Sequence, residues 1–214
     1  AAYRRILAAA EANFGALGFQ KVTVVEIAAA AQVSKPLVYR YFESKEHLYE
    51  VVIRRLVESW NEELLVELSF AAEPSDPTGE PRVAEALRRM HRVSLDFARQ
   101  RPLLRGLLAR EGRLLLAAYS DIVERTNSTL KGQIEECLRA GVEAGTVRLN
   151  LPLEAMADAV TELHLAYVER IVSGTETPDA KQGALDAFEC LLFGICSNEG
   201  SAAPARTKKR KRSK

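Results

Sequence analysis

Apolar residues recur at helical spacing along most of the chain, and no convincing strand, with alternating apolar and polar residues, is found in the sequence. The clearest example starts at Lys45, where apolar residues at near-helical spacing continue to about Leu68 and predict one long helix. Turn-forming residues separate it from the segments that follow. We therefore expect an all-α fold, with further helices over about 82–100, 103–108, 114–144, 153–172 and 179–197.

Residues 23–49 have a different organisation, in which two short helices precede the long one. Thr23 and Glu26 have the spacing of a capping box, so a helix is predicted to begin there. Ser34 suits the N-cap of the second short helix, with Pro36 in its first turn, where the missing N–H is not needed. Two short helices joined by a tight turn form a helix-turn-helix, a motif that reads DNA.

The second short helix carries side chains suited to DNA on one face. Val38 and Phe42 are four residues apart and are expected to face inward. This arrangement turns Lys35, Tyr39 and Arg40 outward. An outward arginine can bind guanine with two hydrogen bonds, and lysine and tyrosine can bind phosphate.

The run TVVEIAAAAQVSKPLVYRYFESKEHL, residues 23–48, resembles the DNA-binding domain of the TetR family of transcriptional regulators. It follows the family pattern of Thr-x-x-x-Ile-Ala, Val-Ser, Leu/Val-Tyr-x-x-Phe and Ser-Lys-x-x-Leu. The resemblance extends to residues 3–19, where Gly18 suits a left-handed helix stop. One departure is Gln32, which stands where the family usually has glycine. The turn is still expected, at a cost on the order of 1 kcal/mol for a non-glycine residue at positive φ.

The resemblance implies nine helices in two domains. Three form a helix-turn-helix DNA-binding domain over residues 1–46, and six form an effector-binding and dimerisation domain over residues 47–199. It also implies a homodimer on a palindromic operator in double-stranded DNA, with the 35–41 helix of each subunit in a major groove. The predicted DNA contacts lie on this helix and at the helix starts around it: Thr23, Ser34, Lys35, Pro36, Tyr39, Arg40, Tyr41 and Lys45.

The same resemblance implies a repressor that a small-molecule effector releases from DNA. The pocket would lie inside the second domain, where apolar walls with a few polar tips suit an apolar or amphipathic ligand. The alternative for each of these residues is a place in the core. The predicted lining is Trp60, Leu64, Leu87, Met90, His91, Ser94, Leu107, Tyr119 and Ile122.

The last two predicted helices are apolar on more than one face, and such helices need cover on both sides. In the family these helices pair with their copies in a second subunit. The alternative is that they only complete the core of a single chain. The predicted dimer contacts are Ala159, Leu163, Tyr167, Leu185, Phe188 and Leu192.

The composition of the chain indicates where in the cell the protein is expected. Of the 214 residues 47% are hydrophobic, but no apolar run reaches the length of about 18 residues that spans a bilayer. A secretory signal is also absent, so we expect a cytoplasmic protein without a membrane partner. The chain does not begin with Met, which leaves open whether residues precede Ala1.

Residues that carry catalysis or bind metals are few and poorly spaced. The three cysteines lack CxxC spacing and no Glu-x-x-His is present, which argues against a zinc or di-iron site. P-loop, GxGxxG and GxSxG motifs are absent as well. We therefore predict no enzyme, no metal and no cofactor. The remaining alternative to a ligand-responsive regulator is a constitutive or architectural DNA-binding protein without an effector.

Charge is unevenly distributed along the chain. The formal net charge is +1, but seven cationic residues among the last nine leave −6 on residues 1–205. Residues 200–214 have no apolar periodicity and are predicted to form a disordered basic tail. Two interpretations stay open, a solvated tail and an arm that contacts DNA without regard to sequence.

Overall fold

The structure, a computed structural model of the chain, describes residues 1–69, 82–108, 120–148, 151–173, 186–192 and 194. A helical segment covers residues 186–192. With it, the described residues contain nine helical segments, so the all-α prediction is confirmed. The other eight are α1 (Ala2–Leu17), α2 (Val24–Ala30), α3 (Lys35–Tyr41), α4 (Lys45–Ser69), α5 (Arg82–Gln100), α6 (Pro102–Leu108), α8 (Ser120–Glu143) and α9 (Leu153–Ser173).

The observed helix bounds lie close to the predicted ones. Helix α5 has the predicted bounds, and α4, α6 and α9 each differ by about one residue. Helix α1 ends before Gly18, whose φ of 79° and ψ of 156° lie outside the left-handed helical region, so the predicted left-handed stop was wrong. The predicted start of α8 near 114, the ends of the 179–197 helix and the basic tail lie outside the described residues.

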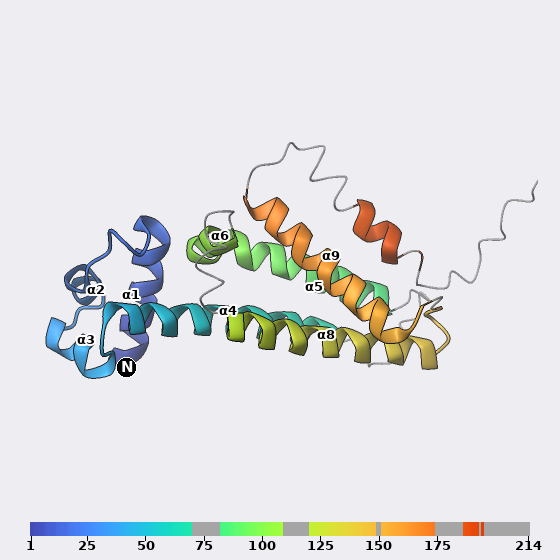
Figure 1. The fold of residues 1–214 in the computed structure, drawn as a ribbon, viewed down its shortest axis with the longest axis horizontal. Helices are drawn as coiled ribbons and strands as arrows, with labels where there is room; N and C mark the ends of the chain where they lie inside the picture. The colour runs from blue at the N-terminus through green and yellow to red at the C-terminus, as the bar shows by residue number, and fades with distance from the viewer. Residues whose placement is uncertain (70–81, 109–119, 149–150, 174–185, 193, 195–214) are drawn as a thin grey trace, which may run out of the picture.

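Figure 1 shows an elongated molecule in which α1, α2 and α3 form a cluster at one end. Helix α4 begins in that cluster and runs out of it beside α8, so one continuous helix joins the cluster to the rest of the protein. Helix α5 packs on α4, and α9 packs on both α5 and α8. Helix α6 packs against α1 and α9, which makes a second contact between the cluster and the remaining helices.

The N-terminal cluster has an aromatic core at the start of α4. The ring of Tyr49 meets that of Phe14 edge to face, with centroids 4.9 Å apart, and that of Phe19 at 4.8 Å. Val38 and Phe42 of α3 are buried, as predicted. Because these residues of α1, α3 and α4 belong to one apolar core, the orientation of α3 follows that of α4.

Hydrogen bonds at the helix starts confirm one of the two predicted caps and show a further one at Ser44. In the capping box of α2, the Glu26 N–H donates to Thr23 Oγ1 at 3.3 Å and the Thr23 N–H donates to Glu26 Oε2 at 2.8 Å. Ser44 caps α4, because its Oγ accepts a bond from the His47 N–H at 3.0 Å. Ser34 occupies the N-cap position of α3, but its hydroxyl makes no capping hydrogen bond, so that part of the prediction was wrong.

The turn between α2 and α3 has a backbone that normally favours glycine. Gln32 has a φ of 53°, the one positive value among non-glycine residues that the structure describes. The Val33 N–H donates to the Ala28 carbonyl and the Gln32 N–H to the Ala29 carbonyl, which is the Schellman arrangement of a helix C-terminus. Gly145 ends α8 in the same manner, at a φ of 74°. The expected turn is confirmed, with strain of about 1 kcal/mol at Gln32.

Gln32→Gly is expected to relieve this strain. The free energy of unfolding should rise by up to about 1 kcal/mol, partly offset by the greater freedom of glycine in the unfolded chain. Gly145→Ala, at the equivalent position of α8, should lower it by about 1 kcal/mol. Urea unfolding of both variants and the parent measures whether the free energy of unfolding rises or falls as expected in each. A Gln32→Gly variant less stable than the parent would contradict the assignment of strain to this backbone position.

The last helical segment packs into its own chain. Phe188 and Leu192 are buried, and the ring of Phe188 stacks on that of His91 in α5 with centroids 4.5 Å apart. Tyr167 of α9 is buried as well. The burial of these three predicted dimer contacts within one chain argues against their contact with a second subunit. Apolar patterning predicted that they would be covered but not which chain would cover them.

Candidate DNA-binding surface and ligand cavity

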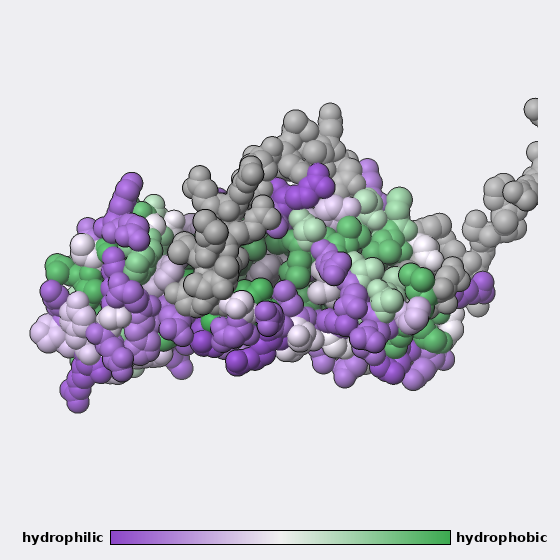
Figure 2. Space-filling model, viewed as in Figure 1, coloured by the Kyte–Doolittle hydropathy of each residue, from purple (hydrophilic) through white to green (hydrophobic). Residues whose placement is uncertain are grey.

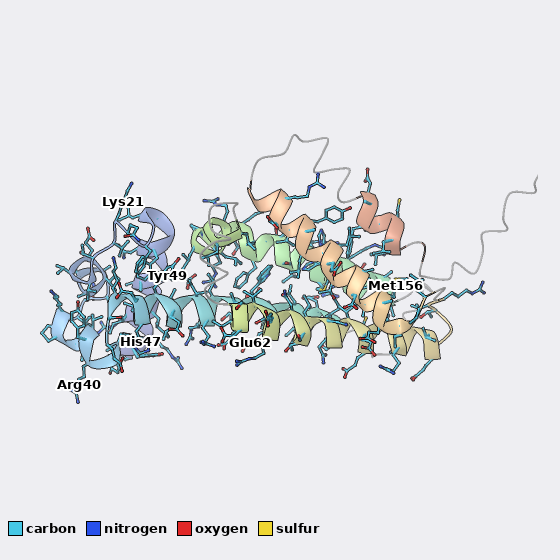
Figure 3. The ribbon with its side chains drawn as sticks, viewed as in Figure 1. Lys21, Arg40, His47, Tyr49, Glu62 and Met156 are labelled. Carbon is cyan, nitrogen blue, oxygen red and sulfur yellow. The ribbon has the colours of Figure 1, made fainter. Side chains whose placement is uncertain are left out.

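Helix α3 presents a basic surface at the end of the molecule. Lys35, Tyr39 and Arg40 are exposed, whereas Val38 on the opposite side is buried, which confirms the predicted orientation. In Figure 3 the side chain of Arg40 points away from the body of the protein. Helix α3 contains no acidic residue, so it carries two positive charges and no negative one. Such a helix can approach base edges and phosphates of a DNA groove.

Two tyrosines at the edges of this surface are held by neighbouring side chains. The ring of Tyr41 meets that of Tyr3 of α1 edge to face at 5.6 Å, and Tyr3 stacks on Phe42 at 5.5 Å. The ring centroid of Tyr39 lies 5.8 Å from Nζ of Lys35. Both predicted tyrosines are 44% exposed, so their hydroxyls can reach a partner. Tyr3 was not among the predicted contacts, because only the packing of α1 beside α3 brings it there.

Lys45 has a different place from the predicted one. Its Nζ donates to the carbonyl oxygens of Phe19 and Val22, both at 3.1 Å, and lies 4.3 Å from the centroid of the Phe19 ring. Two of its three N–H donors are therefore bound to the segment between α1 and α2. This geometry argues against a phosphate contact. Through these bonds Lys45 connects the start of α4 to the segment that leads into α2.

Thr23 and Ser34, two predicted DNA contacts at helix starts, differ in the hydrogen bonds that their hydroxyls make. The Thr23 hydroxyl donates to Glu26 Oε2 at 2.8 Å while it accepts from the Glu26 N–H. Hydrogen bonds from the backbone N–H and the hydroxyl of Thr23 lower the pKa of the Glu26 carboxyl, so a negative charge stands beside Thr23. That charge disfavours a phosphate there. Ser34 and Pro36 are both exposed, and the Ser34 hydroxyl makes no capping bond.

A cavity of about 380 Å³ lies between α4, α6, α8 and α9. In Figure 2 apolar surface is visible along α9, whereas hydrophilic surface dominates along the lower edge of the molecule, where α8 lies. The cavity has apolar walls, two neutral polar groups and two carboxylates, a lining typical of small-molecule sites. The lining residues are Val57, Trp60, Leu104, Leu108, Val123, Thr126, Asn127, Glu162, Leu165, Ala166 and Glu169.

Among the predicted lining residues within the described part of the chain, Trp60 is the one that lines this cavity. Tyr119 lies outside the described residues. Helical spacing predicted burial correctly for the others, but burial against a helix and burial against a cavity have the same sequence pattern. The remaining apolar ones pack in the core: Leu64, Leu87, Met90, Leu107 and Ile122.

The two predicted polar tips that the structure describes, Ser94 and His91, bond to other side chains of the protein. Trp60 Nε1 donates to Ser94 Oγ at 3.0 Å. Nδ1 of His91, one turn earlier on α5, lies 2.9 Å from Nδ1 of His164 on α9, so one ring donates to the other. Burial lowers the pKa of His91 to about 4 and that of His164 to about 3, which keeps both rings neutral. No third metal-ligating side chain joins this pair among the described residues.

Comparison with known proteins agrees with this geometry. The family model described as "Bacterial regulatory proteins, tetR family" matches residues 6–52. The HTH-type transcriptional regulator RutR of Escherichia coli is 30% identical over 145 residues, which cover 68% of this chain and 61% of that protein. The chain belongs to the TetR family. As a TetR-family protein it is a DNA-binding transcriptional regulator, and α1 to α3 form its DNA-binding part.

Further likenesses extend over more of this TetR-family regulator. It is 24% identical to the uncharacterized HTH-type transcriptional regulator YhgD of Bacillus subtilis over 163 residues, 76% of this chain and 80% of that protein. The structure of SmeT from Stenotrophomonas maltophilia matches with a TM-score of 0.65 at 19% identity, covering 94% of this chain and 93% of that one. A putative TetR-family regulator from Mesorhizobium loti gives 0.65 at 21% identity, covering 91% and 96%. None of the described helices is both long and apolar enough to span a membrane.

Proposed function

We propose that this TetR-family regulator is a homodimeric repressor that binds a palindromic operator through α3 and leaves it when a small apolar or amphipathic effector fills the cavity. The observation that carries the proposal is the position of the cavity. Its walls include α4 and α6, and both of these helices also pack against the DNA-binding helix α1. SmeT, a protein of the same fold, is the repressor of a multidrug efflux pump, which supports the assignment as a repressor.

The contact between α1 and α6 is close enough to transmit a small shift. A Cβ atom on Gly15 would lie 2.9 Å from the backbone N of Leu103, so the two helices meet with no side chain between them. Arg101, just before α6, also pairs with Glu11 of α1 at 3.0 Å. Leu104, the residue after Leu103 in α6, lines the cavity. A ligand that displaces Leu104 therefore moves the backbone on which α1 rests.

Helix α4 supplies the second connection. The proposed boundary between a DNA-binding domain, residues 1–46, and an effector domain, residues 47–199, falls in the first turn of this helix, so the two domains share it. In a dimer, the two α3 helices must match half-sites about 34–36 Å apart, one turn of DNA. A tilt of α4 in each subunit would change that distance. The ligand needs to favour the tilted form by only about 1–3 kcal/mol.

The second subunit is proposed to pack on the outer face of α9. Ala159 is exposed there and Leu163 is only half-buried, so both are available for a partner. Leu185, the remaining predicted contact, lies outside the described residues. The small side chain of Ala159 allows a second helix to approach closely at this point.

Filling the cavity by substitution tests the repressor proposal without a known ligand. Thr126, half-buried on α8, lines the cavity, so Thr126→Phe should occupy it from within. We expect operator affinity to fall about 5- to 150-fold, the range of typical allosteric coupling. Trp60 emission should change in the same variant, since its ring shares the cavity wall. The operator is first obtained by selecting bound sequences from a random DNA pool.

Ser128→Phe is the matched control, because Ser128 is exposed on α8 outside the cavity wall. It should leave both operator affinity and Trp60 emission near those of the parent. If Thr126→Phe alters Trp60 emission but binds the operator as tightly as the parent, the cavity is not coupled to DNA. The alternative, a constitutive DNA-binding protein without an effector, would then be preferred.

A further inference from the structure

We propose that the cavity binds an amphipathic cation, an apolar molecule that carries an amine or a quaternary ammonium group. The inference rests on the proposed function and deepens it by naming the chemical class of the effector. Three features carry it: the carboxylates of α9, the ring of Trp60, and the lack of a cationic side chain among the described residues that line the cavity.

Helix α9 places carboxylates at both ends of an apolar patch. One face of this helix lines the cavity with the spacing i, i+3, i+4 and i+7, namely Glu162, Leu165, Ala166 and Glu169. The two glutamates are therefore two turns, or roughly 10 Å, apart along the helix axis. A ligand lying along α9 would have its apolar body against the patch and a charged end beside a carboxylate.

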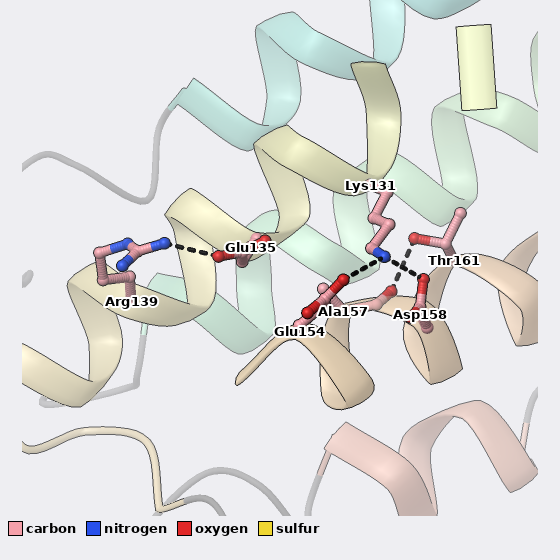
Figure 4. A network of polar contacts seen from close by, with 7 residues as sticks. All are labelled: Lys131, Glu135, Arg139, Glu154, Ala157, Asp158 and Thr161. Carbon is pink, nitrogen blue, oxygen red and sulfur yellow. Dashed lines mark hydrogen bonds and ion pairs between the residues drawn. The ribbon is translucent and has the colours of Figure 1, made fainter. Parts of the chain in front are cut away.

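Glu162 is the carboxylate on which the argument depends. It is exposed, and no hydrogen bond or ion pair reaches it from the residues that the structure describes. The two preceding carboxylates of α9 are in the opposite situation. Lys131 Nζ binds Asp158 at 2.6 Å and Glu154 at 3.4 Å, as Figure 4 shows. Glu162 stands one turn beyond this cluster, so its charge is left for a ligand.

The facing wall also favours a positive charge. The Nε1–H of Trp60 is donated to Ser94, so what Trp60 offers the cavity is its apolar ring. The face of a tryptophan ring attracts cations because of its quadrupole. Thr126 and Asn127 on α8 add neutral hydrogen-bonding groups, which do not discriminate between charges.

A cationic side chain near the cavity is already paired. Arg54 of α4, one turn before the lining residue Val57, binds Glu50 at 3.2 Å and Asp121 at 3.8 Å. The charge that a ligand meets from the described lining residues is therefore negative. Clefts lined by charges of one sign, with walls of low dielectric constant, concentrate the field and strengthen such attraction.

Three probes with the same phenylbutyl body test the inference: 4-phenylbutyltrimethylammonium, 4-phenylbutanol and 5-phenylpentanoate. Each is titrated into the full chain while the emission of Trp60, its single tryptophan, is recorded. The cation is expected to bind about tenfold more tightly than the neutral alcohol. The anion should bind most weakly, since Glu162 repels it.

Glu162→Gln should lower the affinity of the cation about fivefold and leave that of the alcohol unchanged. Glu124→Gln is the matched control. Glu124 is exposed on α8 next to the lining residue Val123, but it does not line the cavity, and the substitution removes the same charge. It should leave the affinities for all three probes near those of the parent.

Equal affinities for the cation and the alcohol would overturn the inference. So would an equal loss of cation affinity in Glu124→Gln and Glu162→Gln, or no change of emission with any probe. Operator release is measured separately with the same probes. If the cation binds through Glu162 but the operator complex stays intact, the cation site stands and the proposed effector response fails. If the alcohol or the anion binds more tightly and releases the operator, the effector response stands and the cation inference fails.

Discussion

Arg40→Ala is expected to relax the base preference at one position of each operator half-site. Arg40 is exposed in the last turn of α3, and an arginine bound to guanine by two hydrogen bonds contributes about 1–3 kcal/mol of discrimination. Affinity for the selected operator should therefore fall about 5- to 150-fold. Affinity for an operator altered at that position should change little. Binding curves on matched and singly mismatched duplexes, at one salt concentration, measure the difference.

Lys45→Ala supplies the contrast. Because its Nζ is bound to the carbonyls of Phe19 and Val22, its loss should loosen the connection between α1 and α2 and weaken binding to all sequences alike. The salt dependence should stay that of the parent, since no phosphate contact is removed. A log–log salt slope smaller by about 1 would instead indicate that Lys45 contacts a phosphate, in line with its prediction as a DNA contact. Equal losses on every sequence for Arg40→Ala would contradict its role as a base contact.

Acid is expected to destabilise the C-terminal helices through the buried histidine pair. Burial lowers the pKa of His91 to about 4 and that of His164 to about 3, against 6.5 for an ordinary histidine. The unfolded chain therefore binds protons first, and stability that is fully present above pH 6.5 is lost as the pH falls toward 4. The loss should amount to at least about 3 kcal/mol. Urea unfolding at pH 7.5, 6 and 5 measures it.

The double variant His91→Leu/His164→Leu is the control for this pH dependence. Each ring also has a buried Nε2 atom without a partner among the described residues, so removing both rings leaves no orphaned group behind. The charged group that acts on His91 from the last helical segment, Glu189, pairs with Arg88 at 2.9 Å and stays in place. The variant should lose less stability between pH 7.5 and 5 than the parent. An equal loss would assign the acid sensitivity to other groups.

The parts of the protein that were predicted from sequence depend on residues close together in the chain. The capping box of Thr23 and Glu26 and the inward face of α3 each involve residues within four positions. The conformation of each of these segments depends mainly on its own side chains and backbone, and little on the rest of the fold. For this reason the exposure of Lys35 and Arg40 on α3 could be predicted.

The parts that were not predicted depend on how distant helices pack. Lys45 had the position of a phosphate ligand in its own helix, but the packing of α4 brings carbonyls from residues 19 and 22 to its ammonium group. His91 was predicted to face a ligand, yet α9 brings His164 to it. The cavity itself is formed by four helices, and Glu162, one of its two acidic residues, has the sequence pattern of any solvent-exposed residue of an amphipathic helix.

The close approach at Gly15 sets a rule for building hybrid regulators from this protein. Its Cα faces the start of α6, where even a methyl group would collide with the backbone of Leu103. A DNA-binding part grafted onto the effector part of another protein would meet a different α6. The distance between α1 and that α6 would then differ from the one in this protein. Grafts that exchange residues 1–46 alone would thus lose the proposed coupling between the cavity and the DNA-binding part, even when both parts fold. Carrying the α6 start, from Arg101 to Leu104, along with the DNA-binding part keeps the matched surfaces together.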